Sequence, residues 1–218
     1  MSSAGAKTGG TPLGGAVSTT GGEGAATPPV PDDIRAAART APEHWFGMVD
    51  PAWSGDGAPP LWAVIGQWRS DADGEITEWQ RNDAYRPSPG MLGWPEPTDD
   101  VDAAMQLAAT GYGPVEAVAL AVVTAELAVL TAPGGGVVSA CTPDGDPVVP
   151  VFTAPGHLER AGALAHRVLP VSEALALVPE GQDLYLNPTG PVALRLSEDD
   201  LSRAVDVLEA AESKEEQN

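Results

Sequence analysis

The residues that could support acid–base chemistry or metal binding are three histidines, one cysteine and several pairs of carboxylates. His44, His157 and His166 do not occur in an H-E-x-x-H pattern or at another spacing typical of a metal site. On one helix, His157 and His166 would lie on opposite sides, about two and a half turns apart. We therefore expect no metal site, and we interpret His157 as an exposed or capping residue near the start of a helix.

The paired carboxylates Asp99-Asp100, Asp144/Asp146 and Asp199-Asp200 lie at expected turns or helix starts. Acidic side chains stabilise helix N-termini, so their position explains them without an acid–base role. The chain has no G-x-S-x-G string, and the run Gly134–Gly136 lacks the Lys-Ser/Thr pair of a phosphate-binding loop. We expect a protein that is not an enzyme, with no catalytic residue and no cofactor.

Charge and cysteine content restrict the partners and the compartment. The net charge of −20 provides no basic surface for nucleic acid phosphates. The acidity serves either solubility or a surface complementary to a basic partner. Cys141 has no second cysteine to pair with, which favours a reducing compartment and hence the cytoplasm. No run approaches the roughly 18 to 20 apolar residues of a membrane helix, so we expect no membrane insertion.

The first thirty residues are rich in Gly, Ala, Ser and Thr and have no apolar periodicity, so we expect residues 1–30 to be a disordered tail. They lack the basic start and the continuous apolar stretch of a signal peptide. A short helix is expected from Pro31 to Arg39, before Pro42.

All six tryptophans lie between Trp45 and Trp94. Within this part, residues 61–69 and 75–80 flank a turn that ends at Gly74, which predicts a β-hairpin. A Pro-rich connector follows, over residues 85–98. The Trp side chains either fill a small core or form an aromatic surface for a partner.

The remaining chain alternates helix and strand patterns and ends in a helix that begins at Ser197. We expect an α+β fold: a mixed, largely antiparallel sheet with helices packed on it, preceded by the Trp-rich hairpin. Cys141 occupies a hairpin position. Helices are predicted over residues 99–111, 114–125, 155–168 and 171–178, and strands over 126–131, 137–142, 148–152, 184–186 and 192–196, the first three strands forming a meander.

Three features follow one another along the chain: the string VPVFT (149–153), a helix start at His157-Leu158, and the string LYLNP (184–188). Residues 187–190 are typical of a tight turn. Over residues 126–210 this order resembles the SseB N-terminal-like domain. Together with the Trp-rich segment, the chain resembles actinobacterial proteins associated with type VII secretion systems. This resemblance implies an accessory or partner-binding role without an established reaction.

We therefore divide the chain into a disordered tail (1–30), a Trp-rich segment with its connector (31–113), an SseB-like α+β domain (114–211) and an acidic tail (212–218). The expected function is that of a non-enzymatic accessory protein, which binds a protein component or a substrate of a type VII secretion system. The candidate partner-binding residues are Trp45, Trp53, Trp68, Trp79, Trp94, Phe152, His157, Asn187 and Pro188.

Two alternatives remain open. Trp45-Phe46-Gly47 matches W-x-G and Tyr112 to Glu116 matches Y-x-x-x-D/E, the patterns of secreted type VII substrates, so the chain could itself be exported. Those substrates are shorter and place W-x-G between two long helices, whereas a Pro-rich, β-rich segment follows it here. The other alternative is an enzyme or small-molecule binder with a pocket beneath the Pro-rich connector.

Overall fold

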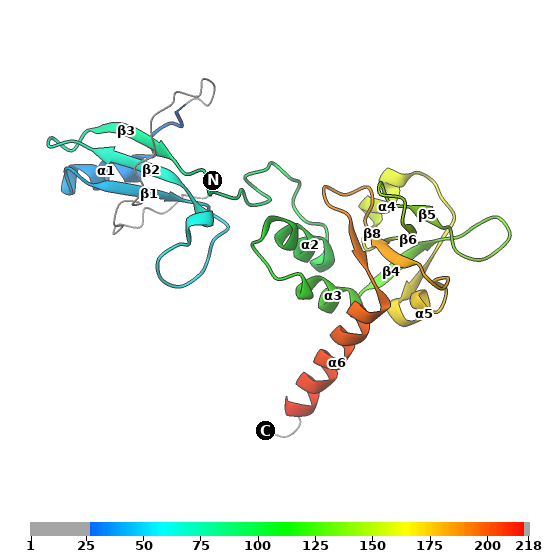
Figure 1. Ribbon diagram of the computed structural model, residues 1–218. Helices are drawn as coiled ribbons and strands as arrows, with labels where there is room; N and C mark the ends of the chain where they lie inside the picture. Colours follow the sequence, from blue (N-terminus) through cyan, green and yellow to red (C-terminus); the bar gives the residue numbers. More distant parts are fainter. Residues whose placement is uncertain (1–26, 216–218) are drawn as a thin grey trace. The chain divides into compact units, whose positions relative to one another are not determined.

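The computed structural model describes residues 27–215, which divide into two compact units after Met91. We call residues 27–91 the N-terminal unit and residues 92–215 the C-terminal unit (Figure 1). Most of the tail expected over residues 1–30 lies outside the described residues, as does the end of the acidic tail.

The N-terminal unit is a three-stranded antiparallel sheet, in the order β1-β2-β3, with one helix against it. The predicted hairpin is confirmed as β2 and β3, and the Asp71–Gly74 turn places Gly74 at a φ of 76°. The strand β1 was not predicted; it pairs Phe46 with Trp68 of β2. The elements are α1 (Asp32–Thr40), β1 (Trp45–Val49), η1 (Leu61–Ala63), β2 (Val64–Ser70) and β3 (Ile76–Arg81).

A small core joins α1 to this sheet. Ile34 and Ala38 of α1 are buried against Phe46 and Trp68, and Trp79 packs at the edge of the cluster. The rings of Trp68 and Trp79 lie 4.5 Å apart between centroids, across the hairpin. Trp68 therefore fills the core of this unit, which contains few aliphatic side chains.

The C-terminal unit confirms the expected α+β class, with a mixed sheet in the order β7-β4-β6-β8-β9 and β5 paired to β6. Neighbouring strands are antiparallel except β6 and β8, which are parallel. The helices are α2 (Asp100–Thr110), α3 (Glu116–Val123), α4 (Pro155–Ala161), α5 (Val171–Leu175) and α6 (Glu198–Glu215). The strands are β4 (Glu126–Leu130), β5 (Ala140–Cys141), β6 (Pro147–Phe152), β7 (His166–Pro170), β8 (Asp183–Leu186) and β9 (Leu194–Leu196).

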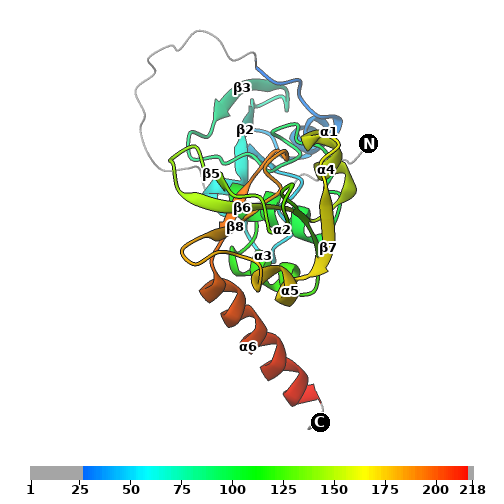
Figure 2. The ribbon, with the colours of Figure 1, turned by 90° about the vertical axis from the view of Figure 1, so that its right-hand side faces the viewer.

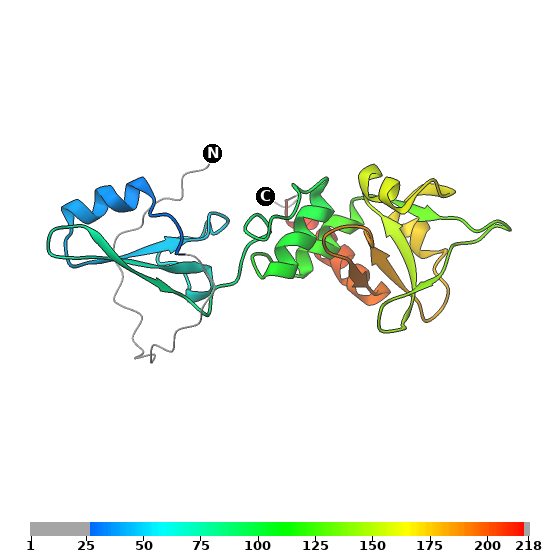
Figure 3. The same ribbon diagram turned by 90° about the horizontal axis from the view of Figure 1, so that it is seen from above.

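Helices α2, α3 and α6 share one core with the sheet (Figures 1 and 3). Met105 of α2, Val122 of α3 and Leu201 of α6 are buried in the same cluster as Leu127 and Val151 of the central strands. Side chains on the opposite face of these strands form a second cluster, which α4 covers through Leu158 and Ala161. The sheet is therefore packed on both faces.

The expected helix over residues 155–168 is wrong beyond Ala161. Gly162 adopts a φ of 105° and ends α4, and the next residues form β7, which pairs with β4 along its whole length. Leu164 and Val168, two apolar residues within the expected helix, are 45% and 55% exposed. Backbone pairing with β4, rather than the helical apolar pattern, thus decides the structure of this segment.

The expected meander is also altered. The predicted strand over residues 137–142 is reduced to β5, which pairs with β6, and a single bridge joins Thr131 to Val137. Strand β6 pairs directly with β4. The Pro133–Gly136 run is therefore part of a longer excursion between neighbouring strands.

Two boundaries differ from the expected division. Helix α2 buries Val101 and Met105 in the core of the C-terminal unit, so the chain divides after Met91 and not after Gly113. Helix α6 continues through Glu215 instead of ending near residue 212 (Figure 2). On this helix, Val205 is 40% exposed. In residues 27–215, no helix combines the length and apolar content required to cross a membrane.

Candidate functional site

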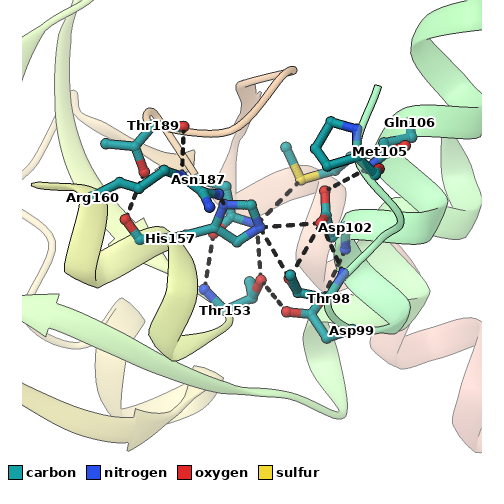
Figure 4. Close-up of polar contacts among 11 residues, drawn as sticks. Thr98, Asp99, Asp102, Met105, Gln106, Thr153, His157, Arg160, Asn187 and Thr189 are labelled. Carbon is teal, nitrogen blue, oxygen red and sulfur yellow. Dashed lines mark hydrogen bonds and ion pairs between the residues drawn. The ribbon is translucent and has the colours of Figure 1, made fainter. Parts of the chain in front are cut away.

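A cluster of polar side chains connects helix α2 to the sheet and to α4 (Figure 4). Three of its members, Asp102, His157 and Asn187, are between 0% and 2% exposed. Burial of polar groups is tolerated only when their hydrogen bonds are made. We call this set the polar cluster: Thr98, Asp99, Asp102, Thr153, His157, Arg160, Asn187 and Thr189.

Asp99 begins the cluster as the N-cap of α2. Its Oδ1 atom accepts the backbone N–H of Asp102 at 2.7 Å, as a capping residue should. Its Oδ2 atom accepts the hydroxyl of Thr153 at 2.7 Å. The cap therefore also ties the start of α2 to the end of β6.

His157 contacts polar groups on both ring nitrogens. Its Nε2 atom lies 3.1 Å from Oδ2 of Asp102 and 3.1 Å from Oγ1 of Thr98. Nδ1 faces Nη2 of Arg160. Because a guanidinium can only donate, Nδ1 accepts and the ring proton lies on Nε2, directed at the carboxylate. The expectation that His157 is exposed is wrong: it is the buried residue of α4, and its ring lies among these polar partners.

Asn187 closes the cluster from the turn between β8 and β9. It adopts a φ of 46°, and its carbonyl accepts the N–H of Gly190 at 2.8 Å, so Asn187 and not Gly190 takes the left-handed conformation in this turn. Its side chain accepts the N–H of Thr153 at 3.0 Å and donates to the Thr153 hydroxyl at 2.8 Å. The hydroxyl of Thr189 donates to the carbonyl of His157 at 2.6 Å.

This geometry differs from that of a nucleophile–histidine–acid triad. In a triad the hydroxyl and the carboxylate occupy opposite ring nitrogens, so that the imidazole takes a proton from one side while the acid orients the other. Here Thr98 and Asp102 share Nε2, and Arg160 occupies Nδ1. The polar cluster is arranged to join α2, β6, α4 and the β8–β9 turn. Among the described residues, no group of three His, Cys, Asp or Glu side chains is placed to hold a metal ion.

A separate surface feature lies between α3, β9 and α6. It is a cavity of about 340 Å³, which we call the groove. Its apolar lining comes from all three elements, and its charged lining consists of Glu116, Arg195, Asp200 and Arg203. The apolar lining residues are Val115, Ala119, Leu120, Leu194, Leu196, Ala204 and Val207.

A comparison with family models bears on the same part of the chain. Residues 101–203 match the SseB protein N-terminal domain. The match begins in α2 and ends in α6, so the matched residues contain most of the polar cluster and most of the groove. From here on, the SseB-like domain means residues 101–203. No curated protein and no solved structure matched the chain.

The structure places the candidate partner-binding residues in three surroundings. Within the SseB-like domain, His157 and Asn187 belong to the polar cluster and Pro188 follows them in the turn, whereas Phe152 is buried against α4 on the other face of the sheet. In the N-terminal unit Trp68 is buried. The other four candidate tryptophans are partly buried: Trp45, Trp53 and Trp79 in the N-terminal unit and Trp94 in the C-terminal unit.

Sequence reasoning missed Thr98, Asp102 and Arg160 as partners of His157, and it missed the groove. The capping pattern at Asp99 was visible, but it does not indicate that Asp102 points at a residue 55 positions later. The groove lacked a local signal as well, because its lining comes from three separate elements.

Proposed function

We propose that this chain is a non-enzymatic accessory protein that acts by binding other proteins, and that its partners belong to a type VII secretion system. The groove of the SseB-like domain is the observation that carries the first part. The second part is supported by the resemblance of residues 45–113 and 126–210 to proteins of that group.

Apolar side chains remain accessible where α3 and α6 meet. Val115 and Val207 both line the groove and are 55% and 56% exposed. Exposed apolar residues that gather at one place, with charged residues at the rim, are typical of a protein-binding surface. The polar cluster supports the same proposal, because its buried groups are occupied with one another and His157 is 1% exposed.

The proposed location is the cytoplasm. Cys141 is an exposed free thiol, which is compatible with a reducing compartment. A cytoplasmic accessory protein would meet substrates or components of the secretion system before export.

The test is affinity purification of the tagged full chain from its source organism at native expression and low salt, followed by mass spectrometry. The proposal expects components or substrates of the secretion system, enriched over an equally acidic tagged control protein. Their absence would contradict it. Accumulation of the chain in the culture filtrate, dependent on the secretion system, would instead support the exported-substrate alternative.

A further inference from the structure

We infer that the groove between α3, β9 and α6 binds an amphipathic helix with basic flanks, supplied by a partner protein. This inference rests on the proposed function and gives it a surface and a partner chemistry.

The walls of the groove favour a helix over a strand. Two of the three bordering elements are helices, α3 and α6. They contribute Leu120, Ala204 and Val207 to the lining, and Val115 adds to it from the N-cap of α3. A helix laid between them would extend the helical layer by ridge-into-groove packing. Strand addition requires a long open edge, whereas β9 has three residues.

The charges around the groove favour a basic partner. Arg195 is paired with Asp146 and Asp183, so its charge is more than balanced. The charge of Arg203 is balanced by one carboxylate, that of Asp200. Among the described residues, the lining acid Glu116 has no basic ion-pair partner.

Helix α6, which forms one wall of the groove, carries further negative charge. Asp199, Asp206 and Glu209 are exposed on it, and acidic residues outnumber basic ones along the helix. Basic residues flanking an apolar stripe would therefore be attracted to the rim. A second copy of this chain is a poorer occupant, because it would bring a net charge of −20 to an acidic surface.

Two exposed valines of α6 provide matched variants. Val207 lines the groove, whereas Val205 is 40% exposed and lies outside its lining. Val207→Lys would place a positive charge and a polar head where the apolar stripe should dock. Val205→Lys makes the same change in charge on another face of the same helix. Neither valine is in the core, so both variants should fold.

The experiment titrates the full chain with a synthetic 18-residue helix that carries Leu at positions i, i+3, i+4 and i+7 and Lys elsewhere. Binding is followed by NMR shift changes and by circular dichroism of the peptide. We expect saturable binding with shifts centred on Val115, Leu120, Leu194 and Val207, and a gain in peptide helicity. Val207→Lys should weaken binding at least tenfold, about 1.4 kcal/mol, and Val205→Lys less than twofold.

Several results would overturn the inference. Equal weakening by both variants would indicate non-specific attraction to the acidic surface, and equal binding of a Glu-for-Lys peptide would remove the role of charge. A peptide that stays unstructured when bound, or no binding at millimolar peptide, would exclude a helix. A concentration-dependent dimer that Val207→Lys dissolves would assign the groove to a second copy. If secretion components co-purify equally with wild type and Val207→Lys, the proposed function stands and this inference fails.

Discussion

The Nε2 atom of His157 lies 3.1 Å from Oδ2 of Asp102, and the two side chains are 1% and 3% exposed. Asp102 comes from α2 and His157 from α4, so this contact joins helices on different faces of the sheet. Removal of one partner leaves the other buried and short of a hydrogen bond, which costs more than the net value of the pair.

His157→Ala should therefore lower the free energy of unfolding by about 3 kcal/mol, as measured by urea denaturation. The matched control is His166→Ala, because His166 is exposed on β7; we expect a change within about 0.5 kcal/mol. Equal effects of the two substitutions would contradict a structural role for the buried histidine.

Asn187 combines a left-handed backbone with two side-chain hydrogen bonds to Thr153. Asn187→Gly should lower the free energy of unfolding by about 2 kcal/mol, because the two hydrogen bonds are lost while glycine adopts the positive φ without strain. Asn187→Ala should lower the free energy of unfolding by about 1 kcal/mol more than Asn187→Gly, since alanine disfavours a positive φ. Urea unfolding of both variants separates the two contributions. Alanine as stable as glycine would mean that the turn relaxes out of this conformation.

Gly66 of β2 has no side chain, and the ring of Trp79 lies in the space that a side chain there would occupy. A Cβ atom at Gly66 would lie 2.4 Å from two atoms of the Trp79 ring and 2.6 Å from the carbonyl oxygen of Gln80. Gly66→Ala should destabilise the N-terminal unit by about 1 to 3 kcal/mol, as followed by Trp fluorescence during denaturation. Gly47→Ala on β1 meets no atom within 4 Å and should have little effect. Two equally tolerated substitutions would show that Trp79 can move aside.

Asp50 should make the stability of the N-terminal unit depend on pH. Burial raises the pKa of its carboxyl, but hydrogen bonds from Tyr85, Ala52 and Ser88 outweigh burial, so the pKa lies below its ordinary value. A carboxyl with a lowered pKa stabilises the folded state above its unfolded pKa, about 3.9, and this contribution is lost as the pH falls through the folded pKa.

The stability difference between wild type and Asp50→Asn should therefore be largest near neutral pH and shrink below about pH 4. Urea denaturation at several pH values measures it. Asp73→Asn, at an exposed position of the hairpin turn, is the control. A difference that grows on acidification would reverse the sign of the prediction.

Ser197 caps helix α6. Its hydroxyl accepts the N–H of Asp200 at 3.2 Å, and the carboxylate of Asp200 accepts the N–H of Ser197 at 3.1 Å. Hydrogen bonds from Ser197, followed by the charge of Arg203, lower the pKa of Asp200. Ser197→Ala should therefore raise that pKa and destabilise the SseB-like domain by about 1 kcal/mol, which NMR titration and urea denaturation measure. Ser202→Ala, at an exposed position inside α6, should change neither quantity appreciably.

The sequence by itself determined the elements whose signals are local. Asp99 and Gly111 were sufficient to bound α2, Gly74 to identify the first hairpin, and Ser197 with its following acids to begin α6. Caps and tight turns depend on residues within one or two turns of the chain, so their chemistry can be read in sequence order. The α+β class followed from the number and order of these elements.

Only the tertiary structure decided the segments and sites that depend on distant partners. Residues 166–168 were expected to end the helix over residues 155–168, yet residues 166–170 form β7 because β4 offers an edge to pair with. His157 and Asp102 meet because α2 and α4 converge on the β8–β9 turn, and the groove exists because α3, β9 and α6 lie side by side. Strand pairing and burial are long-range interactions, and no residue near His157 or Val207 in the chain specifies them.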